Sequence, residues 1–101
     1  MTEREPEQFF YLAPIRGVTD ALFRTTYHNH FPYFTEAIAP FINPQGYSNL
    51  KDSHLFDILP EKNRLLPVTP QLLYNNSEDF IHLGKKIEEL GYTTINWNLG
   101  C

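Results

Sequence analysis

Short apolar segments alternate with longer segments along this chain, and this alternation limits the fold more than any other feature. The apolar segments begin near residues 9, 34, 66 and 93. The first and last are rich in aromatic or β-branched residues, which favours strands. The third contains Pro67 and Pro70, which argues against an ordinary central strand. Overall, a strand–helix alternation predicts right-handed βαβ units and a parallel sheet.

The segments between the predicted strands are expected to be helical. Asp20 can cap a helix over residues 21–29, and a shorter helix is expected over about 50–59. The first helix is expected to bury Leu22, Phe23 and Thr26. Ser77 is the predicted N-cap of the clearest helix, and Gly91 supplies its stop. Its apolar stripe, at spacings of three and four, is Phe80, Leu83, Gly84, Ile87 and Leu90.

The spacing of the strands favours one fold class over another. Eight such units need about 250 residues, the usual size of a (β/α)8 TIM barrel. The 101 residues therefore predict roughly the first four strands of a parallel α/β barrel, with a polar leader over 1–8 and the half barrel over 9–101. A small doubly wound sheet is the alternative. That fold binds nucleotides through a glycine-rich first loop, whereas the first loop here holds a single glycine, Gly17.

Composition excludes several classes of protein. The formal net charge of −4 gives no basic footprint for this stretch to clamp nucleic acid by itself. The sequence has no apolar run long enough for a membrane span and no secretory signal, so we expect a cytoplasmic protein. The one cysteine cannot form an internal disulfide. His28 and His30 lack a third ligand at metal spacing, so no metal site is expected.

Polar residues gather at the predicted carboxyl ends of the strands, where parallel barrels carry their chemistry. The strand ends hold, in order, Pro14-Ile15-Arg16, Glu36 to Ala39, Gln71, and Asn98 with Cys101, so a glutamine, an asparagine and the one cysteine share a rim. Amide side chains beside apolar cover suit a planar heteroaromatic ligand, and the cysteine could act as nucleophile or proton donor. Each residue also has an ordinary interpretation, as a loop tie, a turn cap or a small buried side chain. Their joint position at successive strand ends favours the functional interpretation.

Four motifs in this chain resemble those of the tRNA-dihydrouridine synthases, in the same order. Leu12-Ala13-Pro14-Ile15-Arg16-Gly17-Val18-Thr19-Asp20, followed by Phe23-Arg24, resembles the opening LAPMxGVTDxxFR. Thr35-Glu36 resembles the second-strand TE motif, and Pro70-Gln71-Leu72 resembles the third-strand QL motif. The last segment, Ile95 to Cys101, resembles I-D-x-N-x-G-C-P. Together the motifs cover nearly the whole chain.

The resemblance implies a flavoenzyme that uses FMN, with NADPH as reductant, to reduce a uridine of tRNA to 5,6-dihydrouridine. Pro14, Ile15 and Arg16 would line the flavin, largely through backbone atoms, and Gln71 would bond the edge of its ring. Asn98 would hold the target uridine, which must first leave its stack. Cys101 would be the general acid, since an ordinary thiol is mostly protonated at neutral pH.

The sequence departs from the family pattern at five positions. Ile15 replaces a methionine, Arg16 a small or acidic residue, Asn96 an aspartate and Tyr74 a glycine. Ala39 stands where some members have a basic residue that contacts tRNA. The flavin-phosphate site and the helical tRNA-binding domain of the family would lie beyond Cys101. We therefore expect the isolated half barrel to be inactive and unstable or self-associating, and the parent protein to be the enzyme.

Two other functions remain open from the sequence. One is another flavin-dependent TIM barrel, similar to dihydroorotate dehydrogenase, that acts on a free pyrimidine. Such an enzyme would not require a basic tRNA-binding extension. The other is a truncated barrel without catalytic activity that serves as an interaction module. A truncated barrel could also come from a decayed gene, and the presence of Gln71, Asn98 and Cys101 argues against decay.

Overall fold

The computed structural model describes residues 8–100 of the chain. Within that range lie two α-helices, α1 (Ala21–His30) and α2 (Ser77–Glu89). The five strands are β1 (Tyr11–Leu12), β2 (Glu36–Ile38), β3 (Val68–Thr69), β4 (Gln71–Leu73) and β5 (Asn96–Asn98). Three 3₁₀ helices follow β2: η1 (Tyr47–Asn49), η2 (Asp52–Ile58) and η3 (Pro60–Lys62). Strands and helices therefore alternate as the sequence predicts, at the predicted places.

All strand pairs are parallel. β1 pairs with β2 and β2 with β3, while β4 pairs with β5. β3 and β4 are two halves of one extended segment, interrupted only at Pro70. The N–H of Ala39 donates to the carbonyl of Thr69 at 3.0 Å, and that of Ile42 to the carbonyl of Gln71 at 2.9 Å. The chain of β2 thus runs beside the whole segment, which places the segment between β2 and β5.

Pro70 is tolerated in this interior segment because of the direction in which its backbone faces. The carbonyl of Pro70 accepts the N–H of Asn96 at 2.9 Å. In extended backbone, the N–H and carbonyl of one residue point to the same side of the strand. The N–H that proline lacks would therefore face the β5 side at the point where β5 begins, so no ladder bond is lost. Pro70 therefore splits the predicted strand into β3 and β4 without removing it from the middle of the sheet.

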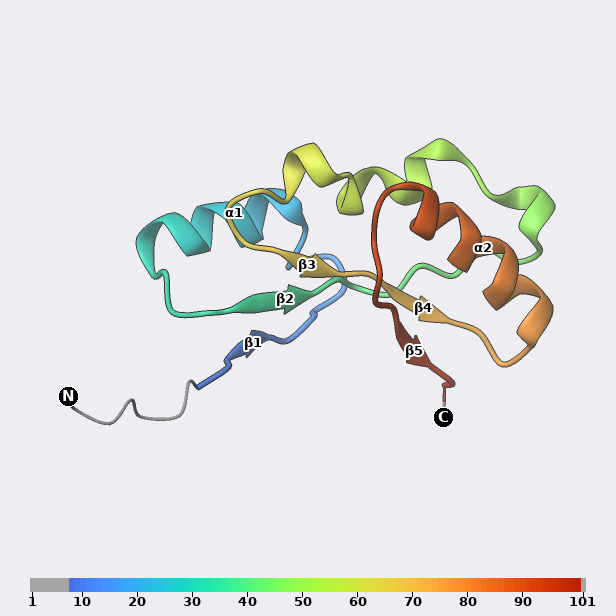
Figure 1. Ribbon diagram of the computed structural model, residues 1–101, viewed down its shortest axis with the longest axis horizontal. Coiled ribbons are helices and arrows are strands. Elements are labelled where there is room, and N and C mark those ends of the chain that lie inside the picture. Colours follow the sequence, from blue (N-terminus) through green and yellow to red (C-terminus); the bar gives the residue numbers. More distant parts are fainter. Residues whose placement is uncertain (1–7, 101) are drawn as a thin grey trace.

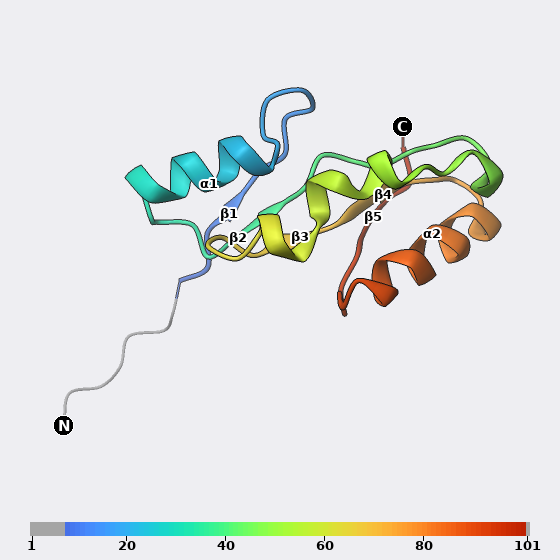
Figure 2. The same cartoon turned by 90° about the horizontal axis from the view of Figure 1, so that it is seen from above.

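Helices cover one side of the strands. In Figure 1, α1, the 3₁₀ helices and α2 all lie above the strands, and Figure 2 shows them spread along the length of the molecule. The hydrophobic core fills the layer between: Ala37, Ala39, Ile42, Ile58, Leu66, Val68, Leu72, Tyr74, Leu83 and Ile87 are buried. Alternate strand residues point to the other face. The side chains that face away from the helices are therefore free to form a site.

Helix α2 follows the sequence prediction closely. Leu83 and Ile87 are buried, and Phe80 and Leu90 pack partly buried against the same core. The N-cap is Asn76 and not Ser77, because the Asn76 side chain accepts the N–H of Asp79 at 2.9 Å. Asparagine and serine are both good caps, so the residue one position earlier took the role.

The face that α1 buries differs from the prediction. Leu22, Phe23 and Thr26 are exposed, and the buried residues are Ala21 and Arg24. The reason is tertiary: Asp57 of η2 lies against Ala21 and Arg24 and accepts hydrogen bonds from both. The helix expected near 50–59 is instead η2, a 3₁₀ helix that ends before Pro60.

The fold class is confirmed as α/β with parallel strands. Among the helices of residues 8–100, none has the length and apolar character needed to cross a bilayer.

Candidate active site

Two carboxamides meet on the strand face that points away from the helices. Gln71 begins β4 and Asn98 ends β5. The register pairs Gln71 with Asn96, two residues before Asn98, so all three side chains share one face of the sheet. Asn98 Nδ2 donates to Gln71 Oε1 at 3.2 Å. The structure therefore brings together two residues that sequence analysis placed at successive strand ends.

Gln71 is also tied to the neighbouring strand. Its Nε2 donates to the carbonyl of Ala39 at 2.8 Å, and only 7% of the residue is exposed. A carboxamide has two N–H donors and two acceptor lone pairs. One donor is used by Ala39 and one lone pair by Asn98, so Gln71 keeps one donor and one acceptor for a ligand. Because both ends are anchored, the amide is held in a fixed orientation.

Asn98 shapes the turn that leads to the cysteine. Its Oδ1 accepts the N–H of Gly100 at 2.9 Å. Gly100 has a φ of +84°, a conformation that glycine adopts without the strain of a Cβ atom. The prediction for Cys101 lies outside the described residues. The turn that precedes it is nevertheless fixed by Asn98, so one asparagine connects the Gln71 carboxamide to the approach of the cysteine.

The first loop, which follows β1, is closed by Thr19. The N–H of Ile15 donates to Thr19 Oγ1 at 2.9 Å, and the Ile15 carbonyl accepts the N–H groups of Val18 and Thr19, each at 3.0 Å. The side chains of Ile15 and Arg16 are exposed, and Pro14 is half-buried. Since the Ile15 N–H is already used, the N–H of Arg16 is the backbone donor this part of the loop offers to a ligand.

A buried arginine holds that loop in place. Arg24 is 1% exposed, and its Nη1 donates to the carbonyl of Thr19 at 2.7 Å and to Asp57 Oδ2 at 2.8 Å. Its Nη2 donates to the Asp57 carbonyl and to Asn63 Oδ1, both at 2.9 Å. Arg24 thus joins the first loop to η2 and to the segment after it. Sequence analysis placed Arg24 in a motif but gave no sign of this cluster, because Asp57 and Asn63 lie 33 and 39 residues away.

A second polar pair lies on the same strand face as Gln71. Thr69 Oγ1 donates to Glu36 Oε1 at 2.5 Å, between β3 and β2. The alternation of the third strand could have placed Thr69 on this face, since it is two residues before Gln71. The face away from the helices therefore carries two polar pairs, Glu36 with Thr69 and Gln71 with Asn98.

Tyr74, at the end of β4, is a structural anchor. Its hydroxyl donates to the carbonyl of Pro44 at 2.7 Å, and the residue is buried. Burial, together with the nearby carboxylate of Asp79, raises the pKa of Tyr74 to about 12. The family pattern has a glycine here, so this tyrosine adds a tie between the loop after β4 and the chain that follows β2.

The donor and acceptor set fits the edge of a planar heteroaromatic ring. Gln71 offers one free donor and one free acceptor, and the Asn98 carboxamide lies beside it. Flavin and uracil rings both carry imide edges that need this pairing. Within residues 8–100 no group of three or more histidine, cysteine, aspartate or glutamate side chains could hold a metal ion.

Comparison with known proteins gives one finding. The family model described as dihydrouridine synthase (Dus) matches residues 11–101, nearly the whole chain. Neither a curated protein nor a solved structure matches the chain significantly.

Proposed function

Since the chain belongs to the dihydrouridine synthase family, we propose that its parent protein reduces a uridine of tRNA to 5,6-dihydrouridine, with FMN as cofactor and NADPH as reductant. The observation that carries this proposal is the carboxamide pair. Gln71 and Asn98 present a fixed donor–acceptor set on the face of the parallel strands that the helices leave open. This set has the polarity that a pyrimidine or flavin ring edge requires.

The strands belong, in this proposal, to the first half of a (β/α)8 barrel. Two features support it: the strands are parallel in the order β1, β2, the β3–β4 segment, β5, and the helices lie on one side of them (Figure 1). The polar face of Glu36, Thr69, Gln71 and Asn98 would then be the interior of the barrel at its carboxyl end, where the active sites of such barrels lie.

Flavin mononucleotide, when bound, supplies hydride for reduction of the carbon–carbon double bond of the base. Gln71 would hold the edge of the flavin ring, with the loop of Pro14, Ile15 and Arg16 beside it. Asn98 would orient the uridine, since its carboxamide lies next to that of Gln71. Addition of hydride leaves negative charge on the pyrimidine, so a proton donor close to the acceptor carbon lowers the barrier.

Cys101 is the proposed proton donor. Cys101 follows the Asn98–Gly100 turn, three residues after the asparagine that would hold the base. A thiol with an ordinary pKa is protonated at neutral pH and can donate, whereas a thiolate could not. The uridine must leave its stack to reach this group, at a cost of a few kcal/mol.

The test uses the full-length parent protein with NADPH and unmodified tRNA. The tRNA is digested to nucleosides, and mass spectrometry looks for a uridine that has gained two hydrogen atoms. We expect this product with the wild-type protein and its loss with Cys101→Ala, while oxidation of NADPH by the bound flavin continues. If NADPH is oxidised and no tRNA uridine changes, the tRNA proposal is wrong and a free pyrimidine becomes the substrate to test.

A further inference from the structure

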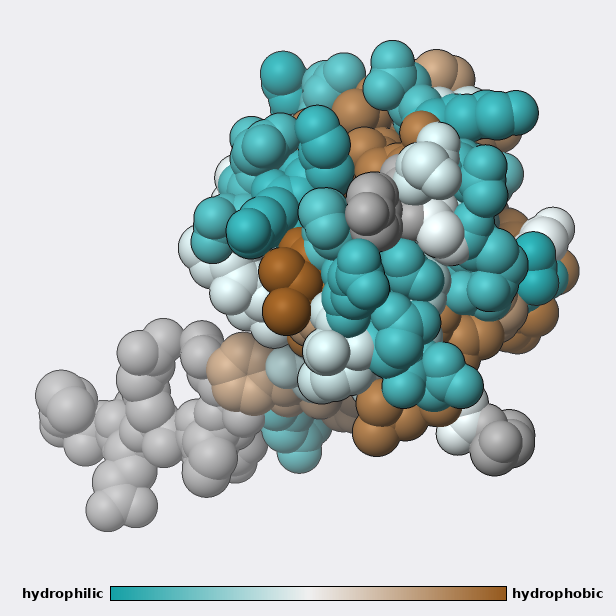
Figure 3. All heavy atoms as spheres, turned by 90° about the vertical axis from the view of Figure 1, so that its right-hand side faces the viewer, coloured by the Kyte–Doolittle hydropathy of each residue, from teal (hydrophilic) through white to brown (hydrophobic). Residues whose placement is uncertain are grey.

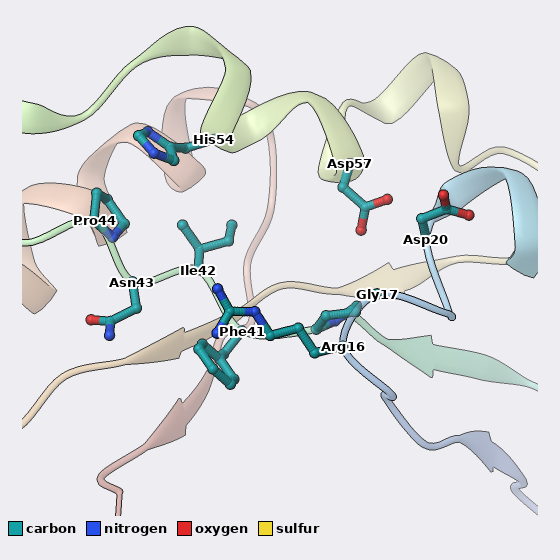
Figure 4. Close-up of a pocket in the computed structure, with 10 residues that line it drawn as sticks. Arg16, Gly17, Asp20, Phe41, Ile42, Asn43, Pro44, His54 and Asp57 are labelled. Atoms are coloured by element: carbon teal, nitrogen blue, oxygen red, sulfur yellow. The ribbon is translucent and has the colours of Figure 1, made fainter.

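A pocket of about 390 Å³ lies outside the strand face that carries Gln71 and Asn98. Three segments line it: the loop after β1, the chain after β2, and η2 (Figure 4). The chain after β2 connects the pocket to the carboxamide pair, because the Ala39 carbonyl and the Ile42 N–H bond to Gln71 while residues 40–44 line the pocket. A strand of nucleic acid at the carboxamide pair would therefore have the pocket as its neighbour.

Arg16 supplies the free positive charge of this pocket. Its guanidinium carbon lies 4.7 Å from the centroid of the Phe41 ring, a cation–π contact that holds the side chain in place. In Figure 4 the arginine extends away from Asp20 and toward Phe41. Within the described part of the chain, no carboxylate pairs with Arg16 and no acceptor takes its guanidinium N–H groups. Its five donors are therefore oriented and unused.

Two further donors line the same pocket. His54 Nδ1 accepts the N–H of Lys51 at 2.9 Å, which places the proton of the neutral ring on Nε2. Asn43 Oδ1 accepts from Gln45 at 3.2 Å, which leaves both Nδ2 hydrogens free. Neither His54 Nε2 nor Asn43 Nδ2 has an acceptor among residues 8–100. Arg16, His54 and Asn43 thus each contribute unused donors to the pocket.

Both carboxylates of the pocket accept hydrogen bonds from other groups of the protein. Asp57 accepts from the N–H of Ala21 at 2.6 Å and from Arg24 at 2.8 Å, so its charge is offset by a buried arginine. Asp20 caps α1 by accepting the N–H of Phe23 at 2.8 Å. An anion at the Arg16 end would therefore meet unused donors and a cation, with the apolar ring of Phe41 beneath the guanidinium.

We propose that this pocket binds a phosphate group of the tRNA strand next to the uridine held at Gln71 and Asn98. The inference rests on the proposed function for the identity of the strand. Arginine recognises phosphate through planar, paired hydrogen bonds, and stacking on Phe41 orients it before the ligand arrives. Through its side chain Arg16 would then contact the sugar–phosphate backbone of the tRNA. This contact is separate from any contact of the Arg16 main chain with the cofactor.

The experiment measures binding of tRNA to the full-length protein by fluorescence anisotropy over a range of salt concentrations. We expect Arg16→Gln to weaken binding about tenfold at low salt. The slope of log affinity against log salt should fall in magnitude by about 0.7 to 0.9, the loss of one phosphate contact. Arg16→Lys, which keeps the charge, should keep the slope. Flavin content is measured by absorbance, and variants are compared at equal occupancy.

Arg64→Gln is the matched control, because it removes the same charge from an exposed residue that precedes β3, at the amino ends of the strands. Equal effects of Arg16→Gln and Arg64→Gln on tRNA binding would overturn the proposal.

A second source of phosphate is NADPH itself. If Arg16→Gln slows reduction of the flavin by NADPH without tRNA and leaves tRNA binding unchanged, the pocket belongs to the dinucleotide and the RNA proposal is wrong.

Failure of this proposal is distinguishable from failure of the proposed function. If the wild-type protein forms dihydrouridine while the two arginine variants bind tRNA alike, the pocket proposal alone is wrong. If no dihydrouridine forms and Arg16→Gln still weakens tRNA binding selectively, the reaction is wrong and the RNA contact stands.

Discussion

Arg24 shows how much a single residue can hold together in this chain. Its guanidinium contacts the loop after β1, the carboxylate and carbonyl of Asp57, and the side chain of Asn63. A buried charge is costly unless it is paired and hydrogen-bonded, and here four acceptors meet it. Since Thr19 in turn bonds Ile15, Arg24 also acts on the loop that we assign to the flavin.

Arg24→Met should therefore destabilise the full-length protein strongly. Methionine keeps the apolar stem but leaves Asp57 and the Thr19 carbonyl without their donor. We expect the free energy of unfolding to fall by about 3 kcal/mol. This is the lower end of the range for breaking a buried ion pair, because a third of the Asp57 side chain is exposed. Urea unfolding measures it, and Arg64→Met, at an exposed arginine, should change it by no more than about 0.5 kcal/mol. Equal losses in the two variants would contradict the role of the cluster.

The raised pKa of Tyr74 predicts how the stability of the protein depends on pH. Burial raises its pKa to about 12 in the folded state, above the ordinary value of about 10 in the unfolded chain. The neutral hydroxyl is therefore favoured by folding, and this contribution is complete below about pH 10 and is lost as the pH rises toward 12. Wild-type stability should fall more steeply across that window than that of Tyr74→Phe, as measured by urea unfolding. Tyr33→Phe, at a tyrosine that is 75% exposed, is the control and should keep the wild-type slope.

At the scale of elements, α2 is the one whose structure is mostly local in origin. Its apolar stripe, its cap at Asn76 and its end at Gly91 all follow from residues within the helix or beside it. η2 is the opposite case. The sequence predicts a helix near 50–59, but its 3₁₀ form is decided by tertiary contacts, because Asp57 bonds α1 and Ile58 is buried in the core.

Gly84 inside α2 and Gly91 just beyond its end should respond in opposite directions to substitution by alanine. Gly91 has a φ of +103°, so Gly91→Ala should lower the free energy of unfolding by about 1 kcal/mol although no atom lies within 4 Å of the new Cβ. Gly84 lies inside the helix, and its Cβ would meet Ile95 Cδ1 at 3.6 Å, an ordinary contact. Gly84→Ala should therefore raise the free energy of unfolding by about 0.5 to 1 kcal/mol. Urea unfolding of both variants checks this, and a shared sign would refute the helix-end assignment.

At the scale of the whole molecule, the surface is uneven. The face at the α2 end is largely hydrophilic, with hydrophobic patches toward its lower and right-hand edges (Figure 3). Around β1 and α1, several large apolar side chains are exposed: Phe9, Phe10, Tyr11, Phe23, Phe31 and Tyr33. Among the described strands, β1 and β5 each pair on one side only. Open edges and apolar surface of this kind favour association.

Residues 1–101, prepared as an isolated polypeptide, should therefore self-associate. Size-exclusion chromatography with light scattering should show a mass that rises with concentration. Phe10→Lys, next to the β1 edge, should reduce association because an edge lysine opposes strand pairing. Phe56→Lys, in η2 and of similar exposure, is the control and should not. A single monomeric species at all concentrations would contradict the prediction.

Much of the fold could be predicted from the sequence, and less of the site. The alternation of strands and helices, the stripe of α2 and the shared strand-end position of Gln71 and Asn98 are visible in the sequence. The buried face of α1 was predicted wrongly, because the periodicity of that short helix does not reveal that Asp57 covers Ala21 and Arg24. The prediction for Cys101 as proton donor stays a prediction.

The sequence by itself determined what depends on neighbours along the chain: the parallel α/β class, the places of the strands and of the two α-helices, and the family motifs. These follow from periodicity, capping and turn chemistry, which act over a few residues. Tertiary structure alone decided the carboxamide contact of Gln71 and Asn98, the burial of Arg24 and the donor-lined pocket around Arg16. The bond between Asn98 and Gln71 joins residues 27 positions apart, and the bonds of Arg24 to Asp57 and Asn63 join residues 33 and 39 positions apart. Only packing of the strands and of η2 brings such groups within bonding distance, so no local pattern could specify them.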